Sequence, residues 1–443
     1  VVNEISEGDT VKVISGAFSN MFGKVKMLDM VNQKIEVALD LFGQETIVEV
    51  LFTEIEKAKQ ELGNENVIDA TLGSLYDEDN NLVTLNSFFN TYRDLNNSDY
   101  AKYSGTFSGN LNYKEAIKNY VIGNSFKNLK ERIVATPGGT GAISITISNM
   151  LSKDETIIIP NIGWTSYNIM AKENNLNIVQ YQMFDKNNNF NLTDLKNKIL
   201  DSLNKQNKAL VIINSPLHNP TGYSLTNNEW KELVRFINED CDNKEVILLN
   251  DVAYIDYSYN LDTVKDYFKE LDNLNNNALI VICYSCSKTF TIYGMRLGAS
   301  IILHKDDEVL DSISNAYDKS CRTYWSNSNN GAMTSISNVL NKNYYEFIKE
   351  KELYINLLKE RSDILLKEAK ENELPIYPYK EGFFITIKVD NSIKDKYHQE
   401  LIKENIFTVQ VNEGIRVAVC SLPINKCYGL SKQLKDILDK VKG

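Results

Sequence analysis

A lysine next to hydroxyl side chains is the feature of this sequence that most directly suggests chemistry. Lys288 follows Ser285 and Ser287 at the end of an apolar run, and Arg296 comes eight residues later. Burial lowers the pKa of a lysine and makes its amine nucleophilic, as Schiff-base formation requires. A nearby arginine supplies a fixed cation for a phosphate group. Taken alone, a short serine–lysine motif more often marks an ordinary strand and loop, so its interpretation depends on further motifs.

A glycine-rich turn offers a second group of anion-binding atoms. Gly138, Gly139, Thr140 and Gly141 follow a predicted strand at residues 133–135 and precede an apolar helix. Backbone N–H groups in such a turn can surround an anion, and the start of a helix adds partial positive charge. The spacing fits neither a P-loop nor the dinucleotide fingerprint GxGxxG. The turn is therefore suited to a phosphate that is not part of a nucleotide.

Two further motifs carry a carboxylate and neutral hydrogen-bond donors. Asn219 follows the apolar run 210–214, and Asp251 ends the next run, with Tyr254 three residues beyond it. Pyridoxal phosphate needs a carboxylate that keeps its ring nitrogen protonated and donors that bind its phenolic oxygen. Each motif alone fits a turn or a strand end. All of them together, in this order, favour a site for this cofactor.

From about residue 60 to residue 443, these motifs resemble the class I/II pyridoxal-phosphate-dependent aminotransferases of fold type I, aspartate and aromatic aminotransferases above all. The resemblance implies that Lys288 carries the cofactor covalently and that Asp251 pairs with its ring nitrogen. It places Asn219 and Tyr254 at the phenolic oxygen. The residues that it places around the phosphate are Gly139, Thr140, Ser285, Ser287 and Arg296.

The resemblance also implies substrate contacts. Trp164 falls where the family stacks an aromatic ring on the cofactor, although a tryptophan can equally be a core residue. Arg416 matches the arginine that binds the substrate α-carboxylate, for which a guanidinium is suited because it pairs bidentately; the alternative is an edge-strand salt bridge. In this family a homodimer builds shared active sites. Tyr103 is the candidate for the tyrosine that reaches the neighbouring subunit's phosphate, but its segment is one residue longer than the family spacing.

The substrate class depends on two weaker similarities. Arg322 resembles the arginine of aspartate aminotransferases that crosses the dimer to bind a side-chain carboxylate. Gly73 begins a segment, residues 73–79, that is similar to the mobile entrance segment of the same branch. Aminotransferases that act on aromatic substrates can carry a similar arginine. Dicarboxylic and aromatic amino acids therefore both stay open as substrates.

The elements that must position these residues form an α/β pattern. After residue 58, short apolar runs alternate with longer helical patterns, which indicates a largely parallel sheet. The predicted strands are residues 156–159, 178–181, 210–214, 246–251, 279–284 and 299–303. From about residue 341, a long charged helix, strands at 383–389 and 415–418 and a final helix predict a smaller α+β domain. The family resemblance implies that the large sheet has seven strands.

Together these observations predict four segments. They are a β-barrel at residues 1–58, the N-terminal part of the small domain at 59–108, a large cofactor-binding domain at 109–335, and the C-terminal small domain at 336–443. Within the first segment, Gly8 to Phe18 followed by Gly23 to Val25 resembles a KOW module, as in the C-terminal domain of NusG-type transcription elongation factors. This segment has ten acidic residues and five lysines, which argues against a nucleic-acid surface. A docking site for a protein partner, a passive appendage and a fusion all remain open.

Composition excludes several classes of protein. The net charge is −11, from 59 acidic and 48 basic residues, which disfavours nucleic-acid binding. No uncharged apolar stretch is long enough for a membrane span. Glu4, Glu7 and Asp9 do not fit a signal peptide, so a cytoplasmic location with reduced cysteines is expected. Cys283 and Cys286 lack the partners of a zinc site, and no metal is expected.

The sequence therefore predicts a homodimeric aminotransferase. It would move the amino group of an L-amino acid, aspartate, glutamate or an aromatic one, to a 2-oxo acid such as 2-oxoglutarate, with ping-pong kinetics. A β-lyase or decarboxylase on the same fold is an alternative, because the orientation of the substrate on the cofactor decides which bond breaks. A transcription regulator with an aminotransferase-like sensor domain is a further alternative, but no basic recognition helix is present.

Overall fold

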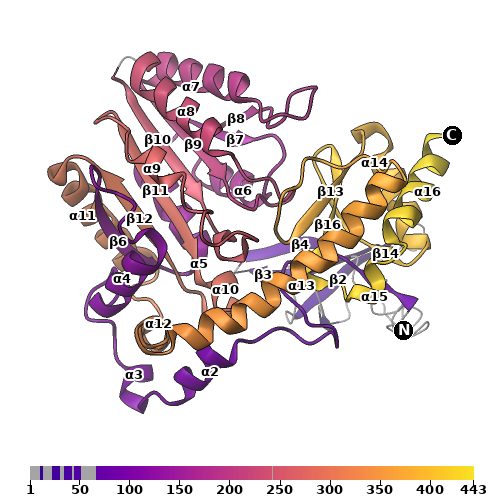
Figure 1. The fold of residues 1–443 in the computed structure, drawn as a ribbon, viewed down its shortest axis with the longest axis horizontal. Helices are drawn as coiled ribbons and strands as arrows, with labels where there is room; N and C mark the ends of the chain where they lie inside the picture. Colours follow the sequence, from indigo (N-terminus) through magenta and orange to yellow (C-terminus); the bar gives the residue numbers. More distant parts are fainter. Residues whose placement is uncertain (1–9, 13–21, 30–33, 42–43, 51–65, 242) are drawn as a thin grey trace.

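The computed structural model describes residues 10–12, 22–29, 34–41, 44–50, 66–241 and 243–443. Residues after 65 form a large domain around one wide sheet and a small domain around a narrower one (Figure 1). The long helix α13 (Tyr344–Glu371) lies against both domains. In the described portion, no helix is both long and apolar enough to span a bilayer.

The sheet of the large domain has seven strands in the order β6-β12-β11-β10-β9-β7-β8. The strands are β6 (Lys130–Thr136), β7 (Thr156–Pro160), β8 (Asn177–Tyr181), β9 (Lys208–Asn214), β10 (Glu245–Asp251), β11 (Ala278–Ser285) and β12 (Gly298–His304). β12 runs antiparallel to both of its neighbours, and the other pairs are parallel. The predicted strands are confirmed, and the expected mostly parallel sheet is a mixed sheet with one reversed strand.

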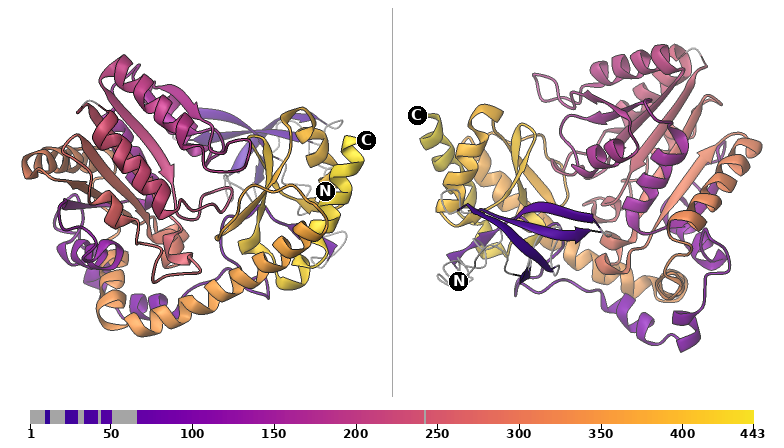
Figure 2. Two further views of the ribbon diagram at one scale, coloured as in Figure 1. Left: turned by 45° about the horizontal axis from the view of Figure 1, so that its top comes forward. Right: turned by 180° about the vertical axis from the view of Figure 1, so that it is seen from behind.

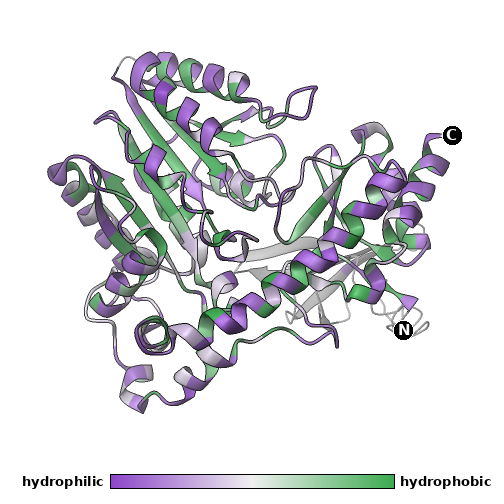
Figure 3. Ribbon diagram, in the orientation of Figure 1, coloured by the Kyte–Doolittle hydropathy of each residue, from purple (hydrophilic) through white to green (hydrophobic). Residues whose placement is uncertain are grey.

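Helices cover both faces of this sheet, which explains why its strands read as continuous apolar runs. In β9, Leu210 and Ile212 pack into one core, and Val211 and Ile213 pack into the other. Figure 3 shows apolar strands between helices whose outer faces are hydrophilic. The helices of the large domain are α4 (Leu111–Ile117), α5 (Gly138–Met150), α6 (Ser166–Glu173), α7 (Leu192–Gln206), α8 (Asn227–Asp240), α9 (Phe268–Leu271), α10 (Cys286–Thr289), α11 (Asp307–Tyr324) and α12 (Asn330–Lys342).

The start of α8 shows how local sequence fixes a loop near the strand ends. Thr226 accepts a hydrogen bond from the backbone N–H of Glu229, and the Glu229 carboxylate accepts one from the N–H of Thr226, which forms a capping box. Glu229 also accepts a hydrogen bond of 2.8 Å from the hydroxyl of Tyr223. The cap therefore anchors the loop that contains Asn219.

The small domain has a core of its own. β13 (Phe384–Lys388), β16 (Gly414–Ala418) and β15 (Val409–Val411) form an antiparallel sheet, and β14 (Ile406–Phe407) pairs with β5 (Ile68–Asp69). Its helices are α14 (Asn391–Lys403), α15 (Ile424–Cys427) and α16 (Leu430–Lys442). The predicted strand pair and the final helix are confirmed.

The chain enters the large domain between residues 70 and 88. Ala70 packs into the core of the small domain, whereas Leu85 and Phe88 pack into a core of the large domain. The short helices α2 (Asn86–Arg93) and α3 (Asn97–Ala101) follow, and both contact α12. The span 59–108 is predicted to belong to the small domain; its described part, from residue 66 onward, contacts both domains.

Helix α13 connects the domains at the other end of the chain. Phe347 stacks on Phe290 of the large domain, and Leu365 and Ala369 pack into the small-domain core. The helix has 28 residues. Figure 2 shows from two further directions that it runs from α12 to the small domain without a break.

The described residues of the N-terminal segment form β-strands, as predicted. β1 (Thr10–Lys12), β2 (Phe22–Asp29), β3 (Lys34–Leu41) and β4 (Gln44–Val50) form an antiparallel sheet in that order. The structure does not show this sheet closing into a barrel. Most of the string from Gly8 to Phe18 lies outside the described residues.

Candidate active site

A cavity of about 290 Å³ opens at the carboxyl ends of the central strands. It lies where open α/β sheets bind their ligands. Asn214 is the last residue of β9, Asp251 of β10 and Ser285 of β11, so adjacent strands deliver their polar ends to one place. The predicted site residues that line the cavity are Gly139, Thr140, Trp164, Asn219, Asp251, Tyr254, Ser285, Ser287, Lys288 and Arg296.

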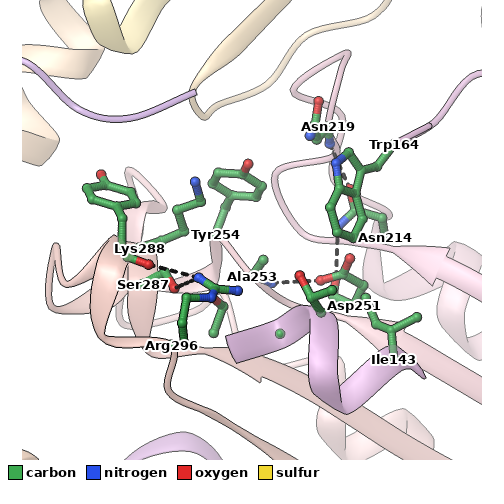
Figure 4. A pocket seen from close by; sticks show the side chains of 14 residues that line it. Ile143, Trp164, Asn214, Asn219, Asp251, Ala253, Tyr254, Ser287, Lys288 and Arg296 are labelled. Carbon is green, nitrogen blue, oxygen red and sulfur yellow. Dashed lines mark hydrogen bonds between the residues drawn. The ribbon is translucent and has the colours of Figure 1, made fainter. Parts of the chain in front are cut away.

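Figure 4 shows that these side chains form two groups. Lys288, Ser287 and Arg296 lie on one side, and Trp164 and Asp251 lie on the other. The site therefore has a cationic end and a carboxylate end, and the amine of Lys288 belongs to the cationic end, beside the ring of Tyr254.

Asp251 is a buried carboxylate with neutral partners. Its Oδ2 accepts a hydrogen bond of 2.5 Å from the hydroxyl of Tyr167, and its Oδ1 accepts one of 3.1 Å from the N–H of Ala253. Burial raises the pKa of Asp251 to about 6, although these hydrogen bonds and the charge of Lys288 act in the opposite direction. A cation placed against this carboxylate would be strongly favoured, because burial leaves the negative charge poorly solvated.

Lys288 lies in the short helix α10, directly after β11. Its Nζ donates a hydrogen bond of 2.9 Å to the carbonyl oxygen of Gly73 and lies 4.8 Å from the ring centroid of Tyr293 and 5.4 Å from that of Tyr254. Burial lowers the pKa of Lys288 to about 8. With that pKa, roughly 10% of the amine is unprotonated at pH 7, far more than for an exposed lysine. The amine is therefore suited to nucleophilic chemistry.

Hydrogen-bond donors suited to a phosphate group lie close together around Arg296, and we call this group the cradle. Gly138 has φ +76°, which favours glycine, and a Cβ there would lie 2.6 Å from Nη2 of Arg296, so a side chain at this position would displace the guanidinium. Arg296 donates hydrogen bonds of 3.3 Å to Oγ of Ser287 and 2.8 Å to the carbonyl oxygen of Tyr293. The first turn of α5 begins at the same place. A guanidinium, hydroxyls and a helix start together make an anion site.

Arg416 reaches the edge of this site from β16. Its Nη2 donates a hydrogen bond of 3.0 Å to the carbonyl oxygen of Thr71, and its Nη1 donates one of 3.4 Å to Oδ1 of Asn219. The guanidinium carbon lies 4.3 Å from the ring centroid of Phe384. Nε of Arg416 is buried and has no hydrogen-bond partner within the described residues. The geometry thus holds a partly unsatisfied guanidinium beside Asn219.

Tyr103 and Arg322 lie away from the cavity. The side chain of Tyr103 is 82% exposed. Arg322 is exposed too; its guanidinium lies 4.9 Å from the ring centroid of Phe107 and donates a hydrogen bond of 3.0 Å to Oγ of Ser326. Both predicted roles need a second subunit, so both stay predictions.

Some residues of the site were not predicted. Tyr167 binds Asp251 and packs edge-on against Trp164, with centroids 5.5 Å apart. Asn214 accepts a hydrogen bond of 2.7 Å from the N–H of Asn219 and donates one of 2.9 Å to the carbonyl oxygen of Asp251. Asn214 could have been predicted from its place at the end of a buried apolar strand. The only sequence feature that points to Tyr167 is that it lies three residues after Trp164.

The arrangement fits pyridoxal phosphate. The cradle around Arg296 would take its phosphate, the poorly solvated carboxylate of Asp251 suits a protonated ring nitrogen, and the amine of Lys288 lies within the same cavity. The described part of the chain places no three His, Cys, Asp or Glu side chains where they could hold a metal ion.

Fold and site together define a fold type I α/β protein with an aminotransferase-like centre. The sequence profile of the family "Aminotransferase class I and II" matches residues 66–430, and the chain belongs to that family. A solved aminotransferase from Anaerococcus prevotii is 30% identical, with a TM-score of 0.85 over 87% of this chain and 95% of its own.

Curated relatives agree with this membership. Aspartate aminotransferase of Escherichia coli is 25% identical over 51% of this chain and 55% of its own length, so the chain spans about half of that relative. Histidinol-phosphate aminotransferase of Methanococcus aeolicus is 27% identical over 66% of this chain and 73% of its own length.

Proposed function

We propose that this protein is a pyridoxal-phosphate-dependent aminotransferase. The observation that carries the proposal is the convergence, in one cavity, of an amine with a lowered pKa, a buried carboxylate with neutral partners and an arginine cradle. Family membership supports it. Bound pyridoxal phosphate would supply an electron sink and a carrier for the amino group.

The carboxylate end would set the charge of the cofactor ring. Asp251 would hold a proton on the ring nitrogen, because the buried carboxylate gains a cationic partner in place of lost solvent. Tyr167 would keep that carboxylate oriented through its 2.5 Å hydrogen bond. Asn219 and Tyr254 would bind the phenolic oxygen, and Trp164 would cover one face of the ring.

Lys288 would first hold the cofactor and, when the amino acid displaces it, act as the base. Its Nζ would take a proton from the substrate Cα and deliver it to C4′ of the cofactor, the carbon on the other side of the amino nitrogen. A pKa of about 8 suits both directions near neutral pH, because the amine can then both accept and release a proton. Gly139, Thr140, Ser285, Ser287 and Arg296 would keep the phosphate fixed during these steps.

Arg416 would bind the α-carboxylate of every substrate. Its unsatisfied Nε–H and its place beside Asn219 support this assignment. Gly73 would border the substrate, because its carbonyl oxygen accepts a hydrogen bond from Lys288. In a homodimer with shared active sites, Arg322 would bind a side-chain carboxylate and Tyr103 the partner's phosphate.

We further propose the division of the chain into residues 1–58, 59–108, 109–335 and 336–443. The first of these would be a KOW-like barrel that docks a protein partner, which the antiparallel order of β1 to β4 supports. A cytoplasmic location is supported by Cys283 and Cys286, which are buried thiols outside any disulfide.

The direct test combines one variant with a donor panel. Wild-type protein mixed with pyridoxal phosphate should develop the absorbance of covalently held cofactor, and Lys288→Ala should not, while circular dichroism shows both folded. Amino acids of each class are then offered with 2-oxoglutarate, or with oxaloacetate when the donor is glutamate. Equimolar amounts of new amino acid and new 2-oxo acid support transamination; carbon dioxide or pyruvate released without an acceptor would instead indicate a decarboxylase or a β-lyase.

Paired arginine variants test the substrate class. Arg416→Ala should impair all donors, because each brings an α-carboxylate. Arg322→Ala should impair aspartate and glutamate by tens to thousands of fold and aromatic donors little, since loss of one partner of a desolvated charge pair costs about 2–5 kcal/mol. Equal losses for both donor classes in Arg322→Ala would refute its role as a carboxylate reader.

A further inference from the structure

A second buried carboxylate lies just beyond the site and binds both ends of the turn that carries Lys288. Oδ2 of Asp256 accepts a hydrogen bond of 2.8 Å from the hydroxyl of Tyr284 and one of 2.7 Å from the hydroxyl of Thr289. Tyr284 directly precedes Ser285, and Thr289 directly follows Lys288. A single oxygen atom therefore bridges the two ends of the turn.

That turn needs support from outside. Helix α10 has only four residues, Cys286–Thr289, and so short a helix gains little stability from its own hydrogen bonds. Ser285, Ser287 and Lys288 all line the cavity, so a small movement of the turn would displace the amine and two phosphate donors together. The hydrogen bonds from Thr289 and Tyr284 to Asp256 limit that movement.

Lys351 of α13 supplies the counter-charge. Its side chain is 0% exposed, and its Nζ has no hydrogen-bond partner within the described residues. The amine lies 4.7 Å from the ring centroid of Tyr257 and 5.0 Å from that of Phe347. A buried cation without a hydrogen bond is costly unless an opposite charge is close. Burial lowers the pKa of Lys351 to about 8, and the negative charge of Asp256 acts in the opposite direction.

The charges around Asp256 keep it ionised. Burial by itself raises the pKa of Asp256, but Lys351, Lys265 and the hydrogen bonds from Thr289 and Tyr284 outweigh it, and the pKa ends below its usual value. The Nζ of Lys265 donates a hydrogen bond of 2.7 Å to the carbonyl oxygen of Tyr120. The other titratable groups that face Asp256 are the hydroxyls of Tyr120, Tyr257 and Tyr344 and the thiol of Cys286.

We propose that Asp256, with Lys351 as its buried counter-ion, is a positioning residue that holds the Lys288 turn in the geometry that binds the cofactor. The proposal rests on the proposed function, because it assigns the turn to cofactor binding. The hydrogen bonds of Asp256 to the turn go to Thr289 and Tyr284, which do not line the cavity, and Asp256 acts through these two residues. The charge pair also links the turn to α13, the helix that both domains share.

The test measures the affinity of full-length protein for pyridoxal phosphate by equilibrium dialysis and the pH midpoint of the bound cofactor's absorbance. Asp256→Asn should weaken binding at least tenfold and shift the midpoint. Thr289→Val, which removes only the hydroxyl, should weaken binding about threefold, and Thr289→Ser, which keeps it, should stay within twofold of wild type.

Asp272→Asn is the matched control. Asp272 is also buried, but it accepts hydrogen bonds from the backbone of residues 127–129, none of which lines the cavity. It should lose stability without a change in cofactor affinity or pH midpoint. A merely structural role for Asp256 would give the same result as this control.

The outcomes separate the two proposals. If wild type fails to bind pyridoxal phosphate, or Lys288→Ala keeps the covalent absorbance, the proposed function fails. If wild type binds the cofactor through Lys288 and folded Asp256→Asn and Thr289→Val both bind it within twofold of wild type, the positioning role is overturned. Should Asp256→Asn not fold, the difference between Thr289→Val and Thr289→Ser decides alone.

Discussion

Two buried carboxylates, five residues apart, have opposite electrostatic surroundings. Asp251 has a tyrosine hydroxyl and a backbone N–H as partners, and burial raises its pKa to about 6. Asp256 faces Lys351 and Lys265, and its pKa is lowered in spite of burial. Both residues are buried aspartates, so the charged groups around each one decide which carboxylate can pair with a ligand. The carboxylate of Asp251 can pair with a cationic group of a ligand, whereas lysines of the chain already offset the charge of Asp256.

The largest expected effect is on the stability of Asp256→Asn. This change removes the negative charge that offsets the burial of Lys351, and leaving a buried charge without its partner costs up to about 3–5 kcal/mol. Chemical denaturation of the cofactor-free protein measures the loss. The double variant Asp256→Asn/Lys351→Met should recover most of it, because both charges are then gone. A single variant as stable as wild type would show that the two charges do not depend on each other.

Asp251→Asn should instead lower turnover. Without the negative charge, the proton on the cofactor ring nitrogen loses its partner, and a loss of about 10²–10³-fold in kcat is expected from removing one preorganised electrostatic contact. Steady-state kinetics with saturating pyridoxal phosphate measures it. Turnover close to that of wild type would show that the charge of Asp251 does not support catalysis, and the functional difference from Asp256 would then not hold.

The contributions of Asp251 and Asp256 to stability should depend on pH in opposite directions. The pKa of Asp251 is about 6 when folded, against 3.8 in its ordinary state, so the folded protein binds this proton more tightly. Between pH 4 and 6, protonation therefore stabilises the cofactor-free fold as the pH falls. Above pH 6 the ionised group costs about 3 kcal/mol, and Asp251→Asn should be more stable than wild type by up to that amount.

This advantage should vanish below pH 4. Denaturation curves of both proteins at several pH values give the difference directly. Asp256 has the opposite sign: its lowered pKa contributes stability above its ordinary pKa that is lost as the pH falls. An equal pH response from the two positions would contradict the assignment of their surroundings.

Tyr167→Phe should give the smallest effect. It removes one hydrogen bond to a charged group, worth about 1.5–3 kcal/mol, and raises the pKa of Asp251 further. A loss of roughly tenfold or more in kcat is expected, with the pH profile moved upward. An unchanged profile would show that the cofactor ring alone fixes the charge of Asp251.

Much of the site follows from strand order alone. Asp251 ends an apolar run, Lys288 and Asn219 follow the ends of two others by a few residues, and parallel strands bring such ends together at one edge of the sheet. The reversed direction of β12 could not be read from its composition, because a buried strand looks the same in either direction.

The residues that sequence reasoning missed depend on distant partners. Nothing near Asp256 in sequence distinguishes it from a surface carboxylate; its role depends on Lys351, 95 residues later. Tyr167 meets Asp251 only because α6 and β10 pack at the same edge. Tyr103 and Arg322 are exposed, and their predicted roles depend on a second chain whose position the sequence does not contain.

Helix α13 has a mechanical consequence for the whole molecule. Its 28 residues correspond to a rod about 42 Å long, held in the large domain near one end and in the small domain near the other. A tilt of about 5° around its middle moves each end by roughly 2 Å. Arg416 and the carbonyl of Thr71 would travel together, since a hydrogen bond joins them. A small rotation of the small domain would therefore change the distance between the guanidinium of Arg416 and the amine of Lys288.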